Sequence, residues 1–119
     1  MTPYELRRLA DRKRAEADAL VASASRLRAT AGAFCDLLAG IAVSSRQVWR
    51  GPAATDFEDR ARRADRSLRE QALVVTDTAA GFDGEAADLR AEARSLDARA
   101  AAAEAATEPH GLSAPGGMD

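Results

Sequence analysis

The chain has very little of the residue types from which most catalytic and metal sites are built. Its 119 residues include one cysteine, Cys35, and one histidine, His110. A lone cysteine excludes an internal disulfide and a thiolate metal cluster, and the serines lack a nearby base that would activate them. Catalysis also needs groups that converge on rigid elements. We therefore expect no enzymatic activity, no metal, no cofactor and no small-molecule substrate.

Long apolar runs are also lacking. The most apolar stretch, residues 33–43, is interrupted by Asp36 and is too short for a membrane span, which takes about 20 apolar residues. The N-terminal sequence MTPYELRRLADRKR is charged and has no apolar core of the kind found in secretory signal peptides. We expect a protein that is cytoplasmic before any export, and an export route that needs no cleaved signal peptide.

Aromatic residues make up only 4% of the chain, whereas there are 30 alanines, and 16 of the 17 basic residues are arginine. A composition rich in Ala and Arg and poor in aromatics is typical of long helices and coiled coils. Nucleic-acid binding usually requires a wide basic face or aromatics that stack on bases. The basic segment from Arg7 to Arg14 is narrow, so we expect no nucleic-acid partner.

Charge is distributed unequally between the two halves of the chain. Residues 1–50 carry nine basic and five acidic groups, and residues 51–119 carry eight basic and fourteen acidic groups. This asymmetry fits a basic arm for nucleic acid, or two helices that complement each other. In an antiparallel pair, the basic start of the first helix would lie beside the acidic end of the second. Exposed ion pairs would add about 0–1 kcal/mol each.

Apolar residues recur every seven positions in both halves, and alanine stands four residues after most of them. Alternating steps of three and four residues are the pattern of a helix-packing seam. Alanine at every seventh position lets two helices approach closely, so the two seams are predicted to pack against each other. The large residues of the predicted seams are Leu20, Leu27, Phe34, Ile41, Val48, Leu68, Val75, Phe82, Leu89 and Leu96.

Prolines are few, and they mark the predicted element boundaries. Thr2 fits an N-cap, with Pro3 at the first helical position and Glu5 three residues after the cap. The short connection before Pro52 requires antiparallel neighbours. We predict an all-α helix-turn-helix hairpin over residues 1–107. Its parts are a helix over about 3–48, a turn over 49–51, a second helix over about 52–106 and a disordered tail over 108–119.

The only tryptophan, Trp49, stands at the one sharp break between the predicted helices. Gly51 can adopt backbone angles that other residues avoid, and Pro52 starts the second helix with its φ already set. The Trp49 ring can cover the end of the seam after Val48, or it can present part of its surface to a partner. These two interpretations are compatible, and both give the motif Trp49, Gly51 and Pro52 a role in the turn.

The sequence Trp49-Arg50-Gly51 between two long helices resembles the W-x-G motif of the WXG superfamily, the small helical-hairpin proteins of type VII secretion systems. The following PAATDF resembles the small residues and the aromatic that often follow that motif. The resemblance covers roughly residues 3–106. It implies a non-enzymatic hairpin that forms a homodimer, or a heterodimer with a sister WXG-type protein, as an antiparallel four-helix bundle. It also implies the type VII secretion machinery as a partner.

One feature departs from the pattern of that family. Exported members usually carry Y-x-x-x-[D/E] just after the second helix. The only tyrosine here is Tyr4, which precedes the first helix seam, and Arg8 follows it by four residues. The resemblance then implies either that a sister subunit supplies the export signal or that export is not the role of this protein.

Several apolar residues fall outside the predicted seams and group in the half of each helix nearest the turn. These residues are Leu37, Val43, Leu73 and Val74, and we predict that they form a partner face. Cys35 lies beside them as a small, partly buried hydrophobe, with a disulfide to a partner chain as the alternative.

Two hypotheses from other classes remain beside the secretion hypothesis. In one, the chain is a cytoplasmic coiled-coil scaffold unrelated to secretion, and the helix could then run straight through Gly51 and Pro52. In the other, the basic segment binds nucleic acid or an anionic membrane surface.

Overall fold

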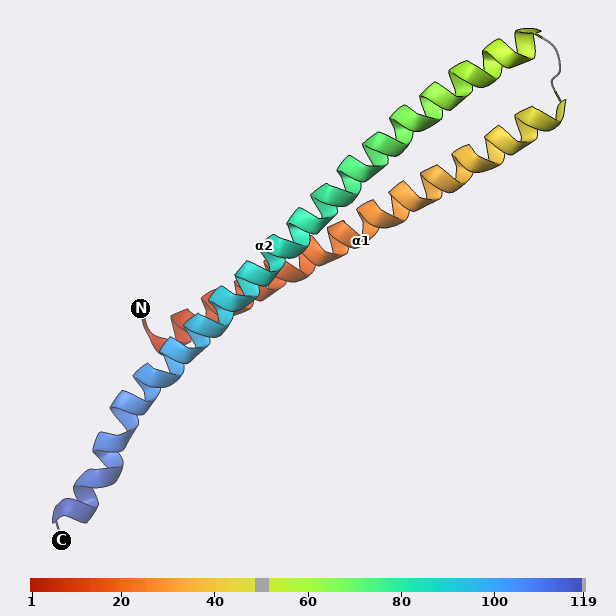
Figure 1. Cartoon of the computed structure of the whole chain (residues 1–119). Helices are drawn as coiled ribbons and strands as arrows, with labels where there is room; N and C mark the ends of the chain where they lie inside the picture. The colour runs from red at the N-terminus through yellow and green to blue at the C-terminus, as the bar shows by residue number, and fades with distance from the viewer. Residues whose placement is uncertain (49–51, 119) are drawn as a thin grey trace. The chain divides into compact units, whose positions relative to one another are not determined.

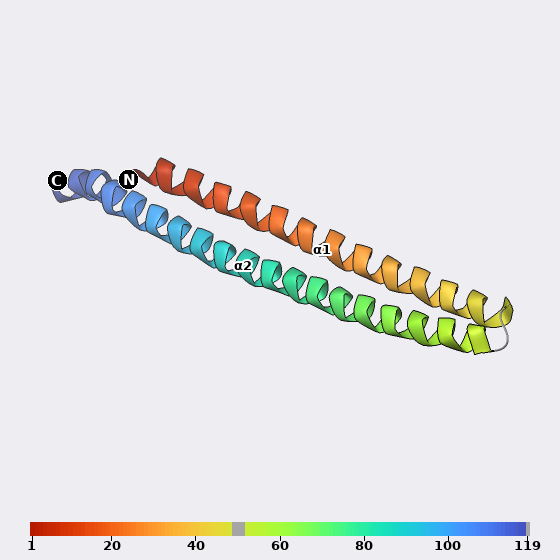
Figure 2. The same ribbon diagram turned by 90° about the horizontal axis from the view of Figure 1, so that it is seen from above.

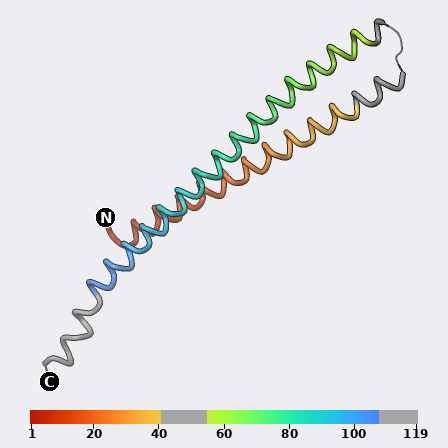
Figure 3. The backbone as a smooth tube through the Cα atoms, in the orientation of Figure 1, coloured from red at the N-terminus to blue at the C-terminus, as the bar shows by residue number. Residues whose placement is uncertain are grey.

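The computed structural model of the chain contains two helices over the residues that it describes (Figure 1). α1 spans Pro3–Val48 and α2 spans Pro52–Met118. The backbone is described for residues 1–48 and 52–118, and side chains are described outside residues 41–54 and 108–119, the two stretches drawn in grey in Figure 3. The all-α fold class predicted from the sequence is confirmed for this part of the chain.

The start of α1 is fixed by a reciprocal capping box. The backbone amide of Glu5 donates to Oγ1 of Thr2 at 3.1 Å, and the amide of Thr2 donates to Oε1 of Glu5 at 3.3 Å. The first backbone bond of the helix follows, from the Leu6 amide to the Thr2 carbonyl at 2.9 Å. These bonds satisfy amides that would otherwise lack a partner at a helix start. The cap predicted at Thr2 is therefore formed.

α2 begins at Pro52, which has no amide hydrogen to leave unpaired in the first turn. The sequence predicts that this helix fades near Ala106, whereas the helical backbone continues to Met118. The residues just before Pro109 are rich in Ala and Glu, which favour helix. No stop signal therefore precedes Pro109. Residues 49–51, the predicted turn, lie outside the described residues.

The chain divides into two compact units, each built from one segment of either helix. Unit 1 consists of Met1–Val21 and Asp83–Asp119, and unit 2 consists of Ala22–Phe82. Within each unit, a segment of α1 lies beside a segment of α2 that runs in the opposite direction, as both views show (Figures 1 and 2). The chain therefore turns back on itself after α1, which excludes one continuous helix through Gly51 and Pro52.

The core of unit 1 is small and consists of aliphatic side chains and methyl groups. Leu6 is 4% exposed and Leu96 8% exposed, and Leu9 packs against the cluster that they form with three alanines, Ala10, Ala93 and Ala100. In unit 2, only Ala24 and Ala79 are buried among the residues whose side chains are described. The firmer packing therefore lies in unit 1.

The described parts of α1 and α2 contain no stretch that is both long enough and apolar enough to cross a membrane.

Candidate interaction surface

Ion pairs join α1 to α2 along unit 1. The guanidinium of Arg7 donates from Nε and from one terminal nitrogen to the two oxygens of Glu104, with both distances 3.0 Å. This two-bond geometry holds the pair more firmly than a single contact. The complementarity of the basic N-terminal segment and the acidic second half, predicted from the charge asymmetry, is confirmed here. Three further pairs link the helices in this unit: Arg14–Asp97, Lys13–Glu92 and Arg90–Asp18.

The Arg7–Glu104 contact changes the acidity of both groups. The side-chain hydrogen bond from Arg7 lowers the pKa of Glu104 below its ordinary value of 4.5, and the same bond raises the pKa of Arg7. Both side chains remain almost half exposed, so solvent screens the pair and its contribution to stability is modest. Its main effect is to fix which residues face each other.

Unit 2 lacks the tight alanine packing of unit 1. Ala24 and Ala79 are fully buried, but Ala31 and Ala72, the next alanines of the two seams toward the turn, are only partly buried. One heptad further on, the seam position holds Leu38 in α1 and, in α2, Asp65. A larger side chain on one helix and a carboxylate on the other cannot close as two methyl groups do.

Asp65 places a carboxylate in the seam of unit 2. Its Oδ2 accepts a hydrogen bond from Nε of Arg69 at 2.9 Å. Its Oδ1 is buried and has no hydrogen-bond partner among the described residues. Burial without a partner is unfavourable for a carboxylate oxygen, so a tighter approach of the helices at this level is disfavoured.

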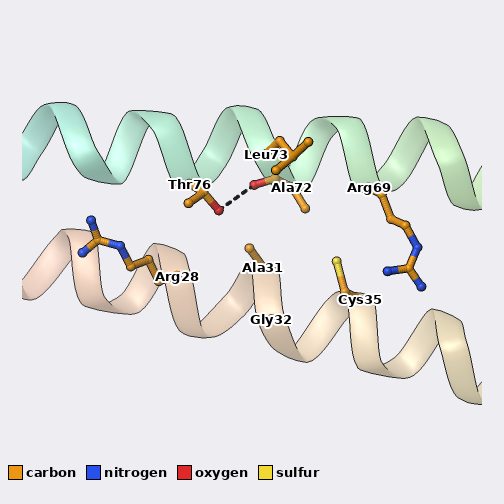
Figure 4. Close-up of a pocket in the computed structure, with 8 residues that line it drawn as sticks. All are labelled: Arg28, Ala31, Gly32, Cys35, Arg69, Ala72, Leu73 and Thr76. Carbon is orange, nitrogen blue, oxygen red and sulfur yellow. Dashed lines mark hydrogen bonds between the residues drawn. The ribbon is translucent and has the colours of Figure 1, made fainter.

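The open seam of unit 2 produces a groove on the side of Cys35, which we call the cysteine-side groove. Its volume is about 570 Å³. Figure 4 shows the Cys35 sulfur and the Ala31 methyl directed toward α2, with Arg28 and Arg69 at opposite ends. Thr76 donates its hydroxyl to the Ala72 carbonyl at 2.9 Å. The lining residues are Arg28, Ala31, Gly32, Cys35, Arg69, Ala72, Leu73 and Thr76.

Two smaller grooves open on the other side of the same seam, and we call them the phenylalanine-side grooves. The first has a volume of about 150 Å³ and is lined by Thr30, Ala31, Phe34, Leu68, Gln71, Ala72 and Val75. The second, of about 380 Å³, is lined by Ser23, Arg26, Leu27, Thr30, Val75 and Phe82. Ala31 and Ala72 line grooves on both sides of the seam. The seam of unit 2 is therefore open on both sides at these two residues.

Large apolar side chains are exposed on both helices of unit 2. Of the predicted partner face, Leu37 is 60% exposed, and Leu73 and Val74 are each 64% exposed. The side chain of Val43 lies outside the described residues. Phe57, which the sequence reasoning did not assign to the partner face, is 43% exposed. Phe57 lies outside the two predicted seam series of the second helix, as Leu73 and Val74 do, and this is the signal that could have identified it.

The predicted seam residues occupy a range of environments. Leu96 is buried, and Phe34 is 44% exposed because it borders a groove and not a closed seam. The side chains of Ile41 and Val48 lie outside the described residues, although Val48 is the last residue of α1. Six predicted seam residues are half-buried: Leu20, Leu27, Leu68, Val75, Phe82 and Leu89.

The turn motif can be placed only in part. Pro52 is the first residue of α2, while Trp49 and Gly51 lie outside the described residues. The prediction that Trp49 covers the end of the seam therefore stays a prediction.

The described side chains of unit 2 offer grooved and apolar surfaces for contact. In the part of the chain whose side chains are described, no group of three or more His, Cys, Asp or Glu residues could hold a metal ion. Cys35 is a half-buried free thiol. The chemistry available to unit 2 is therefore burial of apolar surface, with arginines at the groove ends.

Comparisons of the chain with protein-family models, with curated proteins and with solved structures found no match.

Proposed function

We propose that this chain is a non-enzymatic WXG-type protein of a type VII secretion system, acting as a secreted substrate or as the dimer partner of one. It binds a second helical hairpin, either a copy of itself or a sister protein, to form a four-helix bundle. One observation carries the proposal. The sequence Trp-Arg-Gly lies between α1, which ends at Val48, and α2, which begins at Pro52, and both helices carry a heptad pattern.

The packing of unit 2 supports a role in helix-helix binding. Its seam residues Ala31 and Ala72 border open grooves, and Leu37, Leu73 and Val74 stand more than half exposed. Exposed apolar groups that gather in one part of a chain mark protein interaction sites more often than scattered ones do. A second hairpin on the cysteine side of the seam would bury Leu73, which lines the groove there.

The proposal is tested by export from cells. The tagged chain is expressed in a bacterium with an active type VII secretion system and in the isogenic strain with that system inactivated, each with and without a co-expressed sister protein. We expect the chain in the medium only of the active strain, with a cytoplasmic marker retained in the cells. Retention in every strain would contradict a role as substrate. Failure to associate with any co-expressed sister would then also contradict a partner role.

Trp49→Ala is the informative variant in that assay. We expect it to reduce export or co-purification with the sister protein, because the ring either covers the seam end or contacts the partner. Tyr4→Ala provides a comparison at an exposed aromatic of unit 1, outside the predicted turn motif and partner face. Unchanged export, dimer mass and melting temperature for Trp49→Ala would show that our assignment of Trp49 is wrong.

A further inference from the structure

Asp65 interrupts the alanine series by which α2 packs against α1. The series has a step of seven residues, and its alanines are Ala100, Ala93, Ala86, Ala79 and Ala72. The first four are 0% exposed, whereas Ala72 is only half-buried and lines grooves on both sides of the seam. The next residue of the series is Asp65. The seam therefore opens in the heptad that leads to the aspartate.

Aspartate at this position opposes both the helix and its packing. It has a lower helix propensity than alanine, and it replaces a methyl group with a group that binds water strongly. Its Oδ2 accepts a hydrogen bond from Nε of Arg69 at 2.9 Å, but its Oδ1 is buried and has no hydrogen-bond partner among the described residues. The side chain as a whole is still 31% exposed. Closing the seam would remove this remaining exposure, which is unfavourable for a carboxylate that already has one oxygen unpaired.

The same residue also positions one end of the cysteine-side groove. Arg69 and Cys35 line this groove from opposite helices. The Arg69 side chain extends from α2 toward α1 (Figure 4), and its bond to Asp65 restrains it there. Asp65 therefore acts on the groove in two ways, through the separation of the helices and through the arginine at the groove end.

We propose that Asp65 is a spacer, which keeps the seam of unit 2 open and lowers the stability of the chain on its own. The cysteine-side groove is then present in the isolated chain before any partner binds. A groove that already exists binds more tightly than one that must first be opened, because no free energy of binding is used to open it. The inference concerns the isolated chain and goes beyond the proposed function, since it holds whatever molecule fills the groove.

Leu38 holds the corresponding seam position in α1 and is half-buried. Its size influences the width of the gap, but size alone does not prevent packing, since Leu6 and Leu96 are buried beside alanines in the core of unit 1. A carboxylate differs because it resists the loss of water whatever apolar group lies opposite. We therefore expect the two positions to respond differently when each is reduced to alanine.

The test compares three alanine variants of the full chain. Asp65→Ala restores the alanine series, and Leu38→Ala removes the large side chain from the other helix. The matched control is Asp59→Ala. Asp59 is also a carboxylate of α2 near an arginine of its own helix, Arg62 at 4.0 Å, but its side chain is 57% exposed. Urea denaturation at low protein concentration, followed by circular dichroism, gives the stability of each variant.

Cys35 is the only cysteine of the chain, and its alkylation reports access to the groove that it lines. Each protein is treated with iodoacetamide and, separately, with an iodoacetamide that carries a bulky dye. Both reagents react with the same thiolate, so the ratio of their rates depends on access and not on the acidity of the thiol. Sedimentation equilibrium verifies that the proteins compared have the same state of association.

We expect Asp65→Ala to raise the ratio of folded to unfolded chain about tenfold more than Asp59→Ala does, because it removes a buried oxygen that lacks a partner. The relative rate of the bulky reagent should fall about tenfold in Asp65→Ala, since a closed seam must open locally before that reagent reaches the sulfur. In Asp59→Ala and in Leu38→Ala, the relative rate should not fall.

Three results would overturn the inference. If Asp65→Ala is no more stable than Asp59→Ala, the carboxylate does not oppose closure of the seam. If the relative rate of the bulky reagent is unchanged in Asp65→Ala, the groove does not depend on this residue. If that rate falls equally in Leu38→Ala, the width of the gap keeps the groove open, and the carboxylate does not. Neither measurement involves a second protein or export, so this inference and the proposed function can fail independently.

Discussion

At the scale of single residues, the most completely buried side chains between the helices are methyl groups. The alanines of the two seams in unit 1 and at the start of unit 2 are fully buried, while most of the larger seam residues are half-buried. Alanine loses no side-chain rotamer freedom on burial and has the highest helix propensity. A seam of methyl groups therefore places two backbones close together without opposing the helix, but it provides little apolar area.

Enlarging one of these methyl groups should separate the helices. We expect Ala93→Leu to reduce the free energy of unfolding by about 1–3 kcal/mol, because Ala93 is 0% exposed and has no room for three more carbons. Ala91→Leu, the same change at an exposed position of the same helix, should have little effect. Urea denaturation monitored by circular dichroism measures both. Equal stabilities for the two variants would show that the seam does not pack as described.

Two glycines weaken α2 without serving its packing. A Cβ added to Gly81 or Gly84 would meet no other atom within 4 Å, and glycine in a helix interior costs about 1 kcal/mol relative to alanine. We expect Gly81→Ala and Gly84→Ala each to raise the free energy of unfolding by up to about 1 kcal/mol. Thermal unfolding at low protein concentration provides the measurement. A lower melting temperature would indicate that a bend at these positions is required.

At the scale of elements, the end of unit 1 where α1 begins has two carboxylates that prefer to stay ionised. The backbone and side-chain hydrogen bonds of Thr2 lower the pKa of Glu5, and the side-chain bond of Arg7 lowers the pKa of Glu104, both from an ordinary 4.5. Because each pKa is lower in the folded than in the unfolded chain, the associated stability is complete above about pH 4.5. It is lost as the pH falls through the folded-state pKa values.

Acid should therefore loosen unit 1 through these two groups. We expect the melting temperature to fall between pH 5 and pH 3 and to fall less in Glu104→Gln, which has already lost the ionised partner of Arg7. Glu70→Gln, at an exposed position of unit 2, is the control and should keep the full decrease. An identical decrease in melting temperature for the unmodified chain, Glu104→Gln and Glu70→Gln would show that Glu104 does not contribute to the acid response.

The elements themselves follow closely from local patterns in the sequence. Thr2, Pro3 and Glu5 specify the start of α1 through one capping box, and Pro52 specifies the start of α2. The charge asymmetry anticipates pairs such as Arg7–Glu104 because an antiparallel pair brings those segments together. These features depend on residues a few positions apart or on the direction of the chain, and both are visible in a sequence.

The grooves of unit 2 could not be predicted in the same way. Heptad spacing assigns Phe34 to the seam, yet its side chain is 44% exposed beside a groove. Its burial depends on the distance between the helices at that level, which Leu38 and Asp65 set together from opposite helices. The end of α2 is a second difference: Pro109 predicts that the helix fades near Ala106, whereas the helical backbone extends to Met118.

At the scale of the whole molecule, stability is unevenly distributed between the two units. Unit 1 contains the aliphatic cluster and the ion pairs that link the helices. In unit 2, Ala24 and Ala79 are the buried residues among those whose side chains are described. Local opening is governed by buried contacts and cross-links of this kind, so unit 2 is expected to open more readily when the chain is alone.

Hydrogen exchange should reveal this difference. At low protein concentration, we expect amides near Ala93 and Leu96 to exchange more slowly than those near Ala31 and Ala72. Under the proposed helix-helix binding, raising the concentration should slow exchange mainly in unit 2, where the open grooves and the exposed Leu37 and Leu73 lie. Uniform exchange rates along both helices would contradict the uneven packing, and a concentration effect centred on unit 1 would contradict the location of the dimer contact.

The alanine repeat of unit 1 would by itself allow α1 and α2 to pack in more than one register. Alanine recurs every seventh residue on both helices, so a displacement of one helix by about 10 Å would again match methyl groups with methyl groups. The ion pairs distinguish these positions, since Arg7 faces Glu104 and Arg14 faces Asp97. One step in one direction would set Arg14 against Arg90, and one step in the other would leave Arg7 without an acidic residue opposite. The arginine ion pairs each add little stability. They nevertheless select one register of the two helices from several that the alanine repeat would allow.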